Sequence, residues 1–474
     1  MIFNSFQFVW LFPIIFCVYW ALSGRRQLVE SYSRMGNALL IILSYGIYMQ
    51  WKPVYGLILL GITAWTYLFA IQLERRHRKW YGVFAAVGAL VPLLLFKYYN
   101  FVNDSLIQFF SLFGISVGLP GLNWALPLGL SFYTLQALGY LLDVYHRRIP
   151  AERDWWDYML FVCFFPQIVC GPISKAKDLL PQIKARREFR YAQAVQGLKW
   201  LLWGIFLKVV VADRLGETVD YIFDNYTSQS GPFCALGAFL YAFQIYGDFA
   251  GYSFCAVGVG ELLGFELINN FRRPYLSQSV TEFWHRWHIS LSTWLKDYIY
   301  IPLGGSRCSR ARNYWNILVT FLVSGIWHGA NWTFIVWGLL HGVFQIVEKF
   351  LGLNKLKSSG VLRVLRVVAT FVLVDVAWIF FRMPTLADAW KFVVKLLTDL
   401  RFSVDVSLPE VLWCLCLVVM VLGKDVADES PRLRPLRLLH SGRAVVRWST
   451  YVILLFLILF TGVLASGKFI YAGF

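Results

Sequence analysis

The amino-acid sequence predicts an all-α integral membrane protein that crosses the bilayer about ten to twelve times, because apolar stretches close to the roughly 20 residues of a span recur from end to end. Hydrophobic residues make up 58% of the 474 positions and charged residues only 15%, whereas soluble domains carry about a quarter charged residues. The basic residues, which give a formal net charge of +17, gather in short runs between the apolar stretches. They indicate cytoplasmic loops and not a nucleic-acid-binding surface.

The candidate spans are distributed along the whole chain. They cover residues 5–22, 36–51, 54–72, 80–98, 125–143, 195–212, 233–250, 365–382, 408–423 and 447–466. The first lacks the basic start and the small-residue cleavage site of a signal peptide, so it is interpreted as a retained span. The segment 156–172 is shorter and contains two prolines, which favours a re-entrant or interfacial segment. Because no stretch is typical of a soluble domain, residues 1–474 are interpreted as one membrane domain.

Clusters of lysine and arginine predict the orientation of the chain. They occur at Arg25–Arg26, Arg75–Lys79, Arg147–Arg148, Lys184–Arg187 and Arg272–Arg273. Loops that are rich in lysine and arginine stay on the cytoplasmic side of a membrane. Placing all of these loops in the cytoplasm puts the N-terminus on the outer side.

The apolar region 314–348 is expected to form a broken pair of helices. It is long for one span and short for two, and His-Gly-Ala-Asn at 328–331 interrupts it. The following loop, which is basic from Lys349 to Arg366, also fits the cytoplasm, so the chain must cross twice or not at all. Irregular backbone at membrane depth is tolerated where it is buried in protein or lines a cavity. We therefore expect two helices that meet near His328.

His328 is the first candidate functional residue. Between Trp315 and Glu348 no residue is charged unless a histidine is protonated, and a polar residue inside a membrane segment is a functional hypothesis by default. A low dielectric keeps an imidazole neutral, as a general base near pH 7 requires. The alternative is a histidine that only bonds to a neighbouring helix.

The segment 282–301 is predicted to be one amphipathic interfacial helix. Its polar side chains share one face, namely Glu282, Arg286, Ser290, Thr293, Lys296 and Asp297. Its apolar side chains share the opposite face, namely Trp284, Trp287, Leu291, Trp294, Leu295 and Tyr298. His288 falls on the apolar face, from which it could reach the protein interior beside His328. A core histidine that donates to a carbonyl is the equal alternative.

Asp248 is the third candidate, because a carboxylate late in a span needs a partner. It could orient a histidine or bind a ligand, but we favour a structural role in an unwound Asp-Phe-Ala-Gly turn. The eight cysteines include no CxxC pair, so free, mostly buried thiols are expected. No clustered metal-ligand pattern or nucleotide-binding fingerprint is evident, and we expect no metal and no tightly bound cofactor.

Six sequence blocks, in order, resemble the signatures of the membrane-bound O-acyltransferase family. They are PLGLSFYTLQALGYLLDVY, FFPQIVCGPI, FQIYGDFAGYS, NFRRPYLSQSVTEFWHRWHISLSTWLKDYIYIPLGG, SGIWHGANWTFIVWGLLHG and AWIFFR. The blocks lie within residues 125–382, and the two tryptophan–histidine blocks are the most specific. The bacterial alginate O-acetyltransferase type looks most similar, and the D-alanine transferase of teichoic acids is a neighbouring branch.

The resemblance implies a role for each matched residue. His328 corresponds to the catalytic histidine and His288 to a second, supporting histidine. Supporting or substrate-binding positions are expected at Asp248, Asn331, Trp327 and Trp287.

The resemblance also implies a reaction. An acyl group, expected to be acetyl, moves from a cytoplasmic thioester such as acetyl-CoA to a hydroxyl of an extracytoplasmic polysaccharide, at the bacterial inner membrane. Alginate, another secreted polysaccharide, cellulose, peptidoglycan and teichoic acid stay open as acceptors. A periplasmic hydrolase-like acetyltransferase is the expected protein partner. The competing classes are a proton-coupled transporter, because intramembrane histidines suit a proton relay, and an export scaffold.

Overall fold

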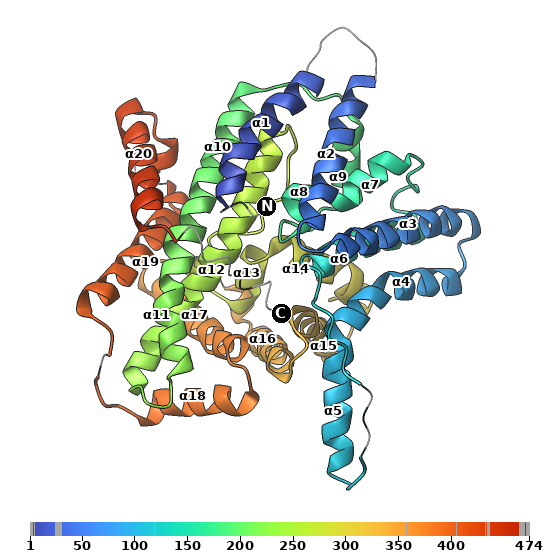
Figure 1. The fold of residues 1–474 in the computed structure, drawn as a ribbon. Helices are drawn as coiled ribbons and strands as arrows, with labels where there is room; N and C mark the ends of the chain where they lie inside the picture. The colour runs from blue at the N-terminus through green and yellow to red at the C-terminus, as the bar shows by residue number, and fades with distance from the viewer. Residues whose placement is uncertain are drawn as a thin grey trace. The chain divides into compact units, whose positions relative to one another are not determined.

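The computed structural model describes residues 3, 5–23, 31–116, 118, 120–356, 358–403, 405–431, 433, 437–463 and 470. Every regular element in this part of the chain is a helix, so the predicted all-α class is confirmed (Figure 1). The predicted basic turn at Arg25–Arg26 and the loop residue Lys357 lie outside the described residues. Two compact units are present, one of Met1–Leu198 with Ala256–Ile268 and one of Lys199–Cys255 with Asn269–Phe474.

The first unit contains the N-terminal helices. They are α1 (Phe6–Ser23), α2 (Ser31–Met49), α3 (Pro53–Arg76), α4 (Lys79–Leu93), η1 (Leu94–Tyr98), α5 (Tyr99–Ser111), α6 (Leu130–Tyr145), α7 (Trp155–Cys163), α8 (Phe165–Ile168), α9 (Ala176–Lys184) and the first part of α10 (Tyr191–Ile205). The predicted re-entrant segment forms α7 and α8, two short buried helices. The buried side chains of Gln136, Gln167 and Ser174 hydrogen-bond to one another across it. Polar groups buried away from water need such partners, so this network stabilises the irregular backbone.

The second unit contains the rest of the chain. Its helices are η2 (Phe206–Ala212), α11 (Asp213–Asp224), most of α12 (Gly231–Leu262), η3 (Pro274–Leu276), α13 (Val280–Arg286), α14 (Ile289–Leu295), η4 (Lys296–Tyr300), α15 (Arg310–His328), α16 (Trp332–Phe350), η5 (Leu353–Lys355), α17 (Gly360–Arg382), α18 (Leu386–Thr398), α19 (Leu408–Glu429), η7 (Leu438–His440) and α20 (Ala444–Thr461).

Six helices in the described residues are long and apolar enough to cross a membrane. They are Pro53–Arg76, Lys79–Ser111, Tyr191–Asp224, Gly231–Leu262, Gly360–Arg382 and Ala444–Thr461, and Gln7–Ser23 is a shorter apolar helix. Each predicted span overlaps at least one of the observed helices. The chain is therefore a polytopic membrane protein.

The predicted broken hairpin near His328 is confirmed. Helix α15 ends at His328 and α16 begins at Trp332, so the two helices meet at the Gly329–Asn331 bend. The helices approach so closely that a Cβ atom on Gly325 would lie 2.4 Å from the Phe334 carbonyl oxygen. Real Cβ atoms essentially never come within 3.0 Å of another heavy atom, so only glycine permits this crossing.

The prediction of one continuous helix over 282–301 is wrong. The segment forms α13, α14 and the π-helix η4, with a break at Trp287 and His288. His288 has a φ of 44°, a left-handed conformation that is uncommon for residues other than glycine. Buried Asn270 stabilises the break, because its backbone and side-chain oxygens accept hydrogen bonds from the Ile289 and Ser290 amides at 3.0 and 3.1 Å. The predicted apolar face is nevertheless turned inward.

The predicted unwound turn at Asp-Phe-Ala-Gly is also wrong. Helix α12 runs without interruption from Gly231 to Leu262 and includes Asp248. A neighbouring irregularity lies instead in η2, a π-helix that contains the buried Lys208. Such local π-helical turns often accompany functional or tightly constrained side chains.

Candidate active site

His328 occupies the bend between α15 and α16, where it is 2% exposed. Its Nδ1 atom lies 2.7 Å from the Ser324 carbonyl oxygen, four residues earlier in α15. A carbonyl can only accept a hydrogen bond, so Nδ1 must carry the proton of the neutral imidazole. The lone pair is then on Nε2, which is the atom that can remove a proton from a substrate. The local helix geometry thus sets the tautomer that a general base requires.

His288 lies in the same cluster of aromatic side chains. It is fully buried, and its ring centre is 4.6 Å from that of Phe249 and 5.9 Å from that of Trp327. Trp327 in turn lies 4.9 Å from the His328 ring, so one indole contacts both histidines. Burial lowers the pKa of His288 well below its ordinary value, and a positive charge on His328 would lower it further. His288 is therefore neutral at pH 7.

Trp287, the residue before His288, packs among other aromatic side chains. Its fully buried ring lies 5.0 Å from Phe271 and 5.1 Å from Trp378. Trp327 thus contacts both histidine rings, whereas Trp287 contacts other aromatic side chains such as Phe271 and Trp378.

A third histidine, His341, was not among the residues predicted from the sequence. It lies in α16, is fully buried, and accepts a hydrogen bond on Nδ1 from the Trp284 indole N–H at 3.2 Å. Its ring is 5.1 Å from that of Trp337, which is 4.6 Å from that of His328. The rule that made His328 a candidate, a histidine within an apolar membrane segment, applies equally to His341.

Asp248 is buried in an ion pair and not beside a histidine. Its carboxylate accepts hydrogen bonds from Lys208 Nζ at 2.6 Å and from the Ile470 backbone N–H at 2.8 Å. Lys208 also binds Asp213 at 2.7 Å, so one buried ammonium bridges two carboxylates. The need of Asp248 for a partner was predicted correctly. Its neighbour Phe249 contacts His288, so the ion pair lies next to the residues that support the cluster.

Asn331 caps the second helix of the hairpin. Its side-chain oxygen accepts a hydrogen bond from the Thr333 amide at 3.1 Å, and its amide group donates to the Pro384 carbonyl at 2.8 Å. Capping satisfies one of the free N–H groups at the start of α16. Both bonds fix the bend that follows His328.

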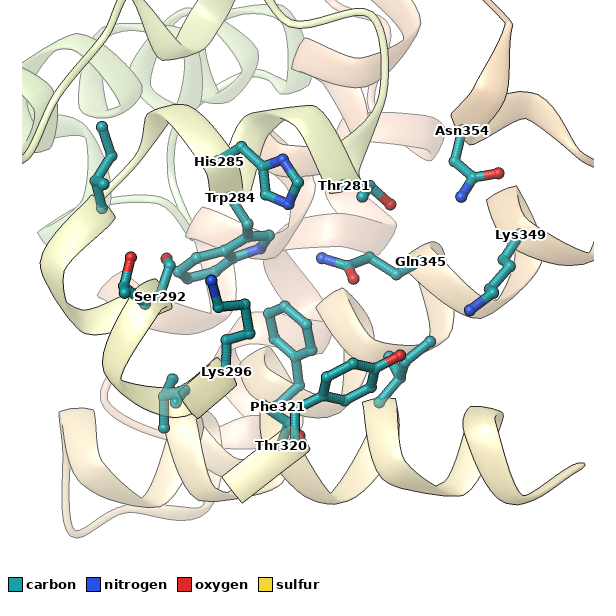
Figure 2. Close-up of a pocket in the computed structure, with 15 residues that line it drawn as sticks. Thr281, Trp284, His285, Ser292, Lys296, Thr320, Phe321, Gln345, Lys349 and Asn354 are labelled. Carbon is teal, nitrogen blue, oxygen red and sulfur yellow. The ribbon is translucent and has the colours of Figure 1, made fainter. Parts of the chain in front are cut away.

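A pocket of about 460 Å³ is lined in part by Trp284 (Figure 2), the residue that hydrogen-bonds to His341. Its lining comes from α13, α14, η4, α15, α16 and η5, and consists of Thr281, Trp284, His285, Ile289, Ser292, Thr293, Leu295, Lys296, Tyr300, Ile317, Thr320, Phe321, Gln345, Lys349 and Asn354. The lining is mixed, with the aromatic rings of Trp284 and Phe321 and the ammonium groups of Lys296 and Lys349. Such a pocket suits a ligand that has an apolar end and an anionic end.

In the described part of the chain, no group of three or more histidine, cysteine, aspartate or glutamate side chains could hold a metal ion. All eight cysteines are free, as predicted. The pocket lining offers the His285 imidazole, the Trp284 indole and the ammonium groups of Lys296 and Lys349.

Comparison with known proteins identifies the family. Residues 154–355 match the model of the membrane-bound O-acyltransferase family. The chain is 38% identical over 397 residues to the "probable alginate O-acetylase AlgI" of Pseudomonas aeruginosa, and the aligned region covers 82% of this chain and 74% of that protein. It is 33% identical over 420 residues to the peptidoglycan O-acetyltransferase of Helicobacter pylori, with coverages of 82% and 79%. It is 27% identical over 299 residues to a teichoic acid D-alanyltransferase of Streptococcus thermophilus, with coverages of 60% and 68%.

The matched residues include the two short helices α13 and α14, the hairpin of α15 and α16, and therefore His288, His328 and His341. A buried histidine whose Nδ1 bonds to a backbone carbonyl, set in a polytopic helical membrane protein, agrees with this assignment. The chain belongs to the membrane-bound O-acyltransferase family and is an O-acyltransferase.

Proposed function

We propose that this protein transfers an acetyl group from a cytoplasmic thioester, such as acetyl-CoA, to a hydroxyl of an extracytoplasmic polysaccharide, with His328 as the general base. The observation that carries the proposal is the Nδ1 contact of His328 with the Ser324 carbonyl, which leaves Nε2 to accept a proton in a site that is 2% exposed. An alcohol has a pKa far above 7, so it needs a base as it attacks.

The reaction then proceeds by addition and elimination. His328 Nε2 removes the hydroxyl proton while the hydroxyl oxygen forms a bond to the thioester carbonyl carbon. The carbonyl π electrons move to oxygen and then return, so that the C–S bond breaks and the thiolate leaves. The His328 imidazolium gives its proton to this thiolate, which regenerates the base. The products are an ester and a thiol, and no water enters the balance.

His288 is proposed as a second histidine that orients the donor or stabilises the oxyanion. Its burial keeps it neutral, so it can donate one hydrogen bond without bringing a second positive charge next to the His328 imidazolium. Because donors that are fixed in a site of low dielectric stabilise developing charge effectively, a neutral N–H can assist the addition step. The tautomer of His288 decides which ring nitrogen acts.

The pocket is proposed as the donor site. Coenzyme A and phosphopantetheine carry phosphate groups, and Lys296 and Lys349 line the pocket. Lys349 also begins the basic loop that the sequence predicts to be cytoplasmic. A donor that enters from this side would place its phosphates near the lysines and its thioester near Trp284.

The acceptor is proposed on the opposite side of the inner membrane, which fits the names of the relatives. These name alginate, peptidoglycan and teichoic acid as what the related enzymes modify. Transfer proceeds either directly to the glycan or first to a periplasmic hydrolase-like acetyltransferase. Alginate or another secreted polysaccharide is our first choice, because the alginate O-acetylase has the highest identity to this chain, 38%, among the three relatives named above.

The test is acyl transfer by the purified protein in lipid nanodiscs. Radiolabelled acetyl-CoA and D-alanyl carrier protein are offered in parallel, each with alginate, peptidoglycan and teichoic acid fragments. We expect label on a polysaccharide hydroxyl from the acetyl donor. If only the D-alanyl donor labelled an acceptor, the transferred group would be D-alanyl and not acetyl. Proton flux across the membrane with no transfer from any donor would instead indicate a transporter.

A further inference from the structure

The pocket and His328 are separated by aromatic rings. Trp284 and Phe321, here called the aromatic barrier, line the pocket and lie 5.2 Å apart between ring centres (Figure 2). On its other side the Trp284 ring lies 5.7 Å from that of Trp337, which contacts His328 at 4.6 Å. The Trp284 side chain therefore lies between the pocket that it lines and the Trp337 ring that contacts His328.

A side-chain hydrogen bond adds to the ring contacts that hold Trp284 in the barrier. The Trp284 indole N–H donates to His341 Nδ1 at 3.2 Å, and the Trp284 and His341 side chains are 4% and 0% exposed. The His341 ring lies nearly perpendicular to the Trp284 ring, at 88° and 5.1 Å. Because Nδ1 accepts this bond, the proton of neutral His341 is on Nε2. Neither partner is charged, so the bond can break and re-form at low cost.

We propose that Trp284 is a movable barrier between the donor pocket and His328, and that His341 is the positioning residue that holds it closed. The proposal rests on the proposed function, since it assumes that a thioester occupies the pocket. While the barrier is closed, the buried base is shielded from a pocket that is open to water. The barrier opens when the acyl end of the donor displaces the Trp284 indole.

The barrier suppresses a wasteful side reaction. If His328 could reach the thioester without an acceptor, it could remove a proton from water, and the attack of that water would produce acetate and a free thiol. Exclusion of water from the site prevents such hydrolysis of a reactive donor. A weakened barrier should therefore raise the hydrolysis of the donor relative to transfer, while the proposed base His328 is unchanged.

The experiment measures acetyl-CoA hydrolysis and acetyl transfer by the full-length protein in nanodiscs. His341→Leu removes the acceptor of the Trp284 bond and keeps an apolar side chain, and Trp284→Phe removes the donor. Each should raise the ratio of hydrolysis to transfer roughly threefold to tenfold, the factor expected for one neutral hydrogen bond. His341→Gln offers an amide oxygen to the Trp284 N–H and should return the ratio toward that of the wild type.

The variants also distinguish the possible failures. The double variant Trp284→Phe with His341→Leu should raise the ratio no further than either single variant, because both remove the same bond. His146→Leu, a change at the exposed histidine that directly follows α6, serves as the control. An unchanged ratio in Trp284→Phe and His341→Leu, beside an active wild type, would overturn the barrier alone. A wild type that neither hydrolyses nor transfers acetyl would overturn the proposed function and the barrier together.

Discussion

The close crossing of α15 and α16 at Gly325 should determine the position of His328 and thereby the rate of acyl transfer. Gly325 lies one helical turn before His328, and a Cβ atom there would stand 2.4 Å from the Phe334 carbonyl oxygen. Ordinary contacts begin at 3.4 Å, so Gly325→Ala must move the two helices about 1 Å apart. Overpacking of this kind costs about 1–3 kcal/mol of stability. A displacement of about 1 Å at a catalytic group lowers turnover by roughly 100-fold.

The assay for Gly325→Ala combines thermal unfolding in nanodiscs with the turnover number for acetyl transfer. The control is Gly61→Ala in α3, where an added Cβ atom meets nothing within 4 Å. That change should leave turnover unaltered and stabilise the helix by up to about 1 kcal/mol, the difference in helix propensity between glycine and alanine. A Gly325→Ala protein with the melting temperature and the turnover of the wild type would refute the argument that this crossing positions His328.

Four further outcomes follow from the structure. Lys208→Met should destabilise the protein by about 3–5 kcal/mol in chemical denaturation, because it leaves two buried carboxylates without their cation; a loss below 1 kcal/mol would contradict this. Lys296→Gln combined with Lys349→Gln should raise the KM for acetyl-CoA about tenfold and weaken its salt dependence, with little change in kcat; an unchanged KM would move the donor to another site. Because the native pKa of His288 is depressed and the unfolded value is about 6.5, the unfolded chain binds more protons below pH 6.5. Stability should therefore fall as the pH drops through this range, and His288→Gln should reduce the slope in pH-dependent unfolding. Reporter fusions at Arg76, Arg148 and Arg186, which lie in basic loops, should all give a cytoplasmic signal. A periplasmic signal at two of these three sites would reverse the predicted orientation.

Local patterns in the sequence were enough to predict the helices and the hairpin of α15 and α16. Apolar length predicted the helices, and the interruption at 328–331 predicted the hairpin of α15 and α16, because breaks in apolar runs are themselves local features. The inward position of His288 also followed from helical periodicity. The family was recognisable because its tryptophan–histidine blocks survive as continuous strings of residues.

Features that depend on distant residues could not be predicted in the same way. The break at His288 is stabilised by Asn270, eighteen positions earlier, and the helical periodicity of the apolar side chains continues across it. Lys208 is forty positions from Asp248, so a search for a nearby basic residue could not find this partner. His341 was overlooked for another reason. Its own sequence environment is as apolar as that of His328, and only the Trp284 bond distinguishes its role.

In the proposed mechanism, His328 Nε2 takes the proton from the acceptor hydroxyl. The most direct test is the single-turnover rate of acetyl transfer by His328→Ala protein that is inserted and folded normally in nanodiscs. Removal of a general base should lower this rate by roughly 100- to 10,000-fold, while the binding of acetyl-CoA, measured separately, stays within about twofold of the wild type. A folded His328→Ala protein that transfers acetyl at a rate close to that of the wild type would contradict the claim.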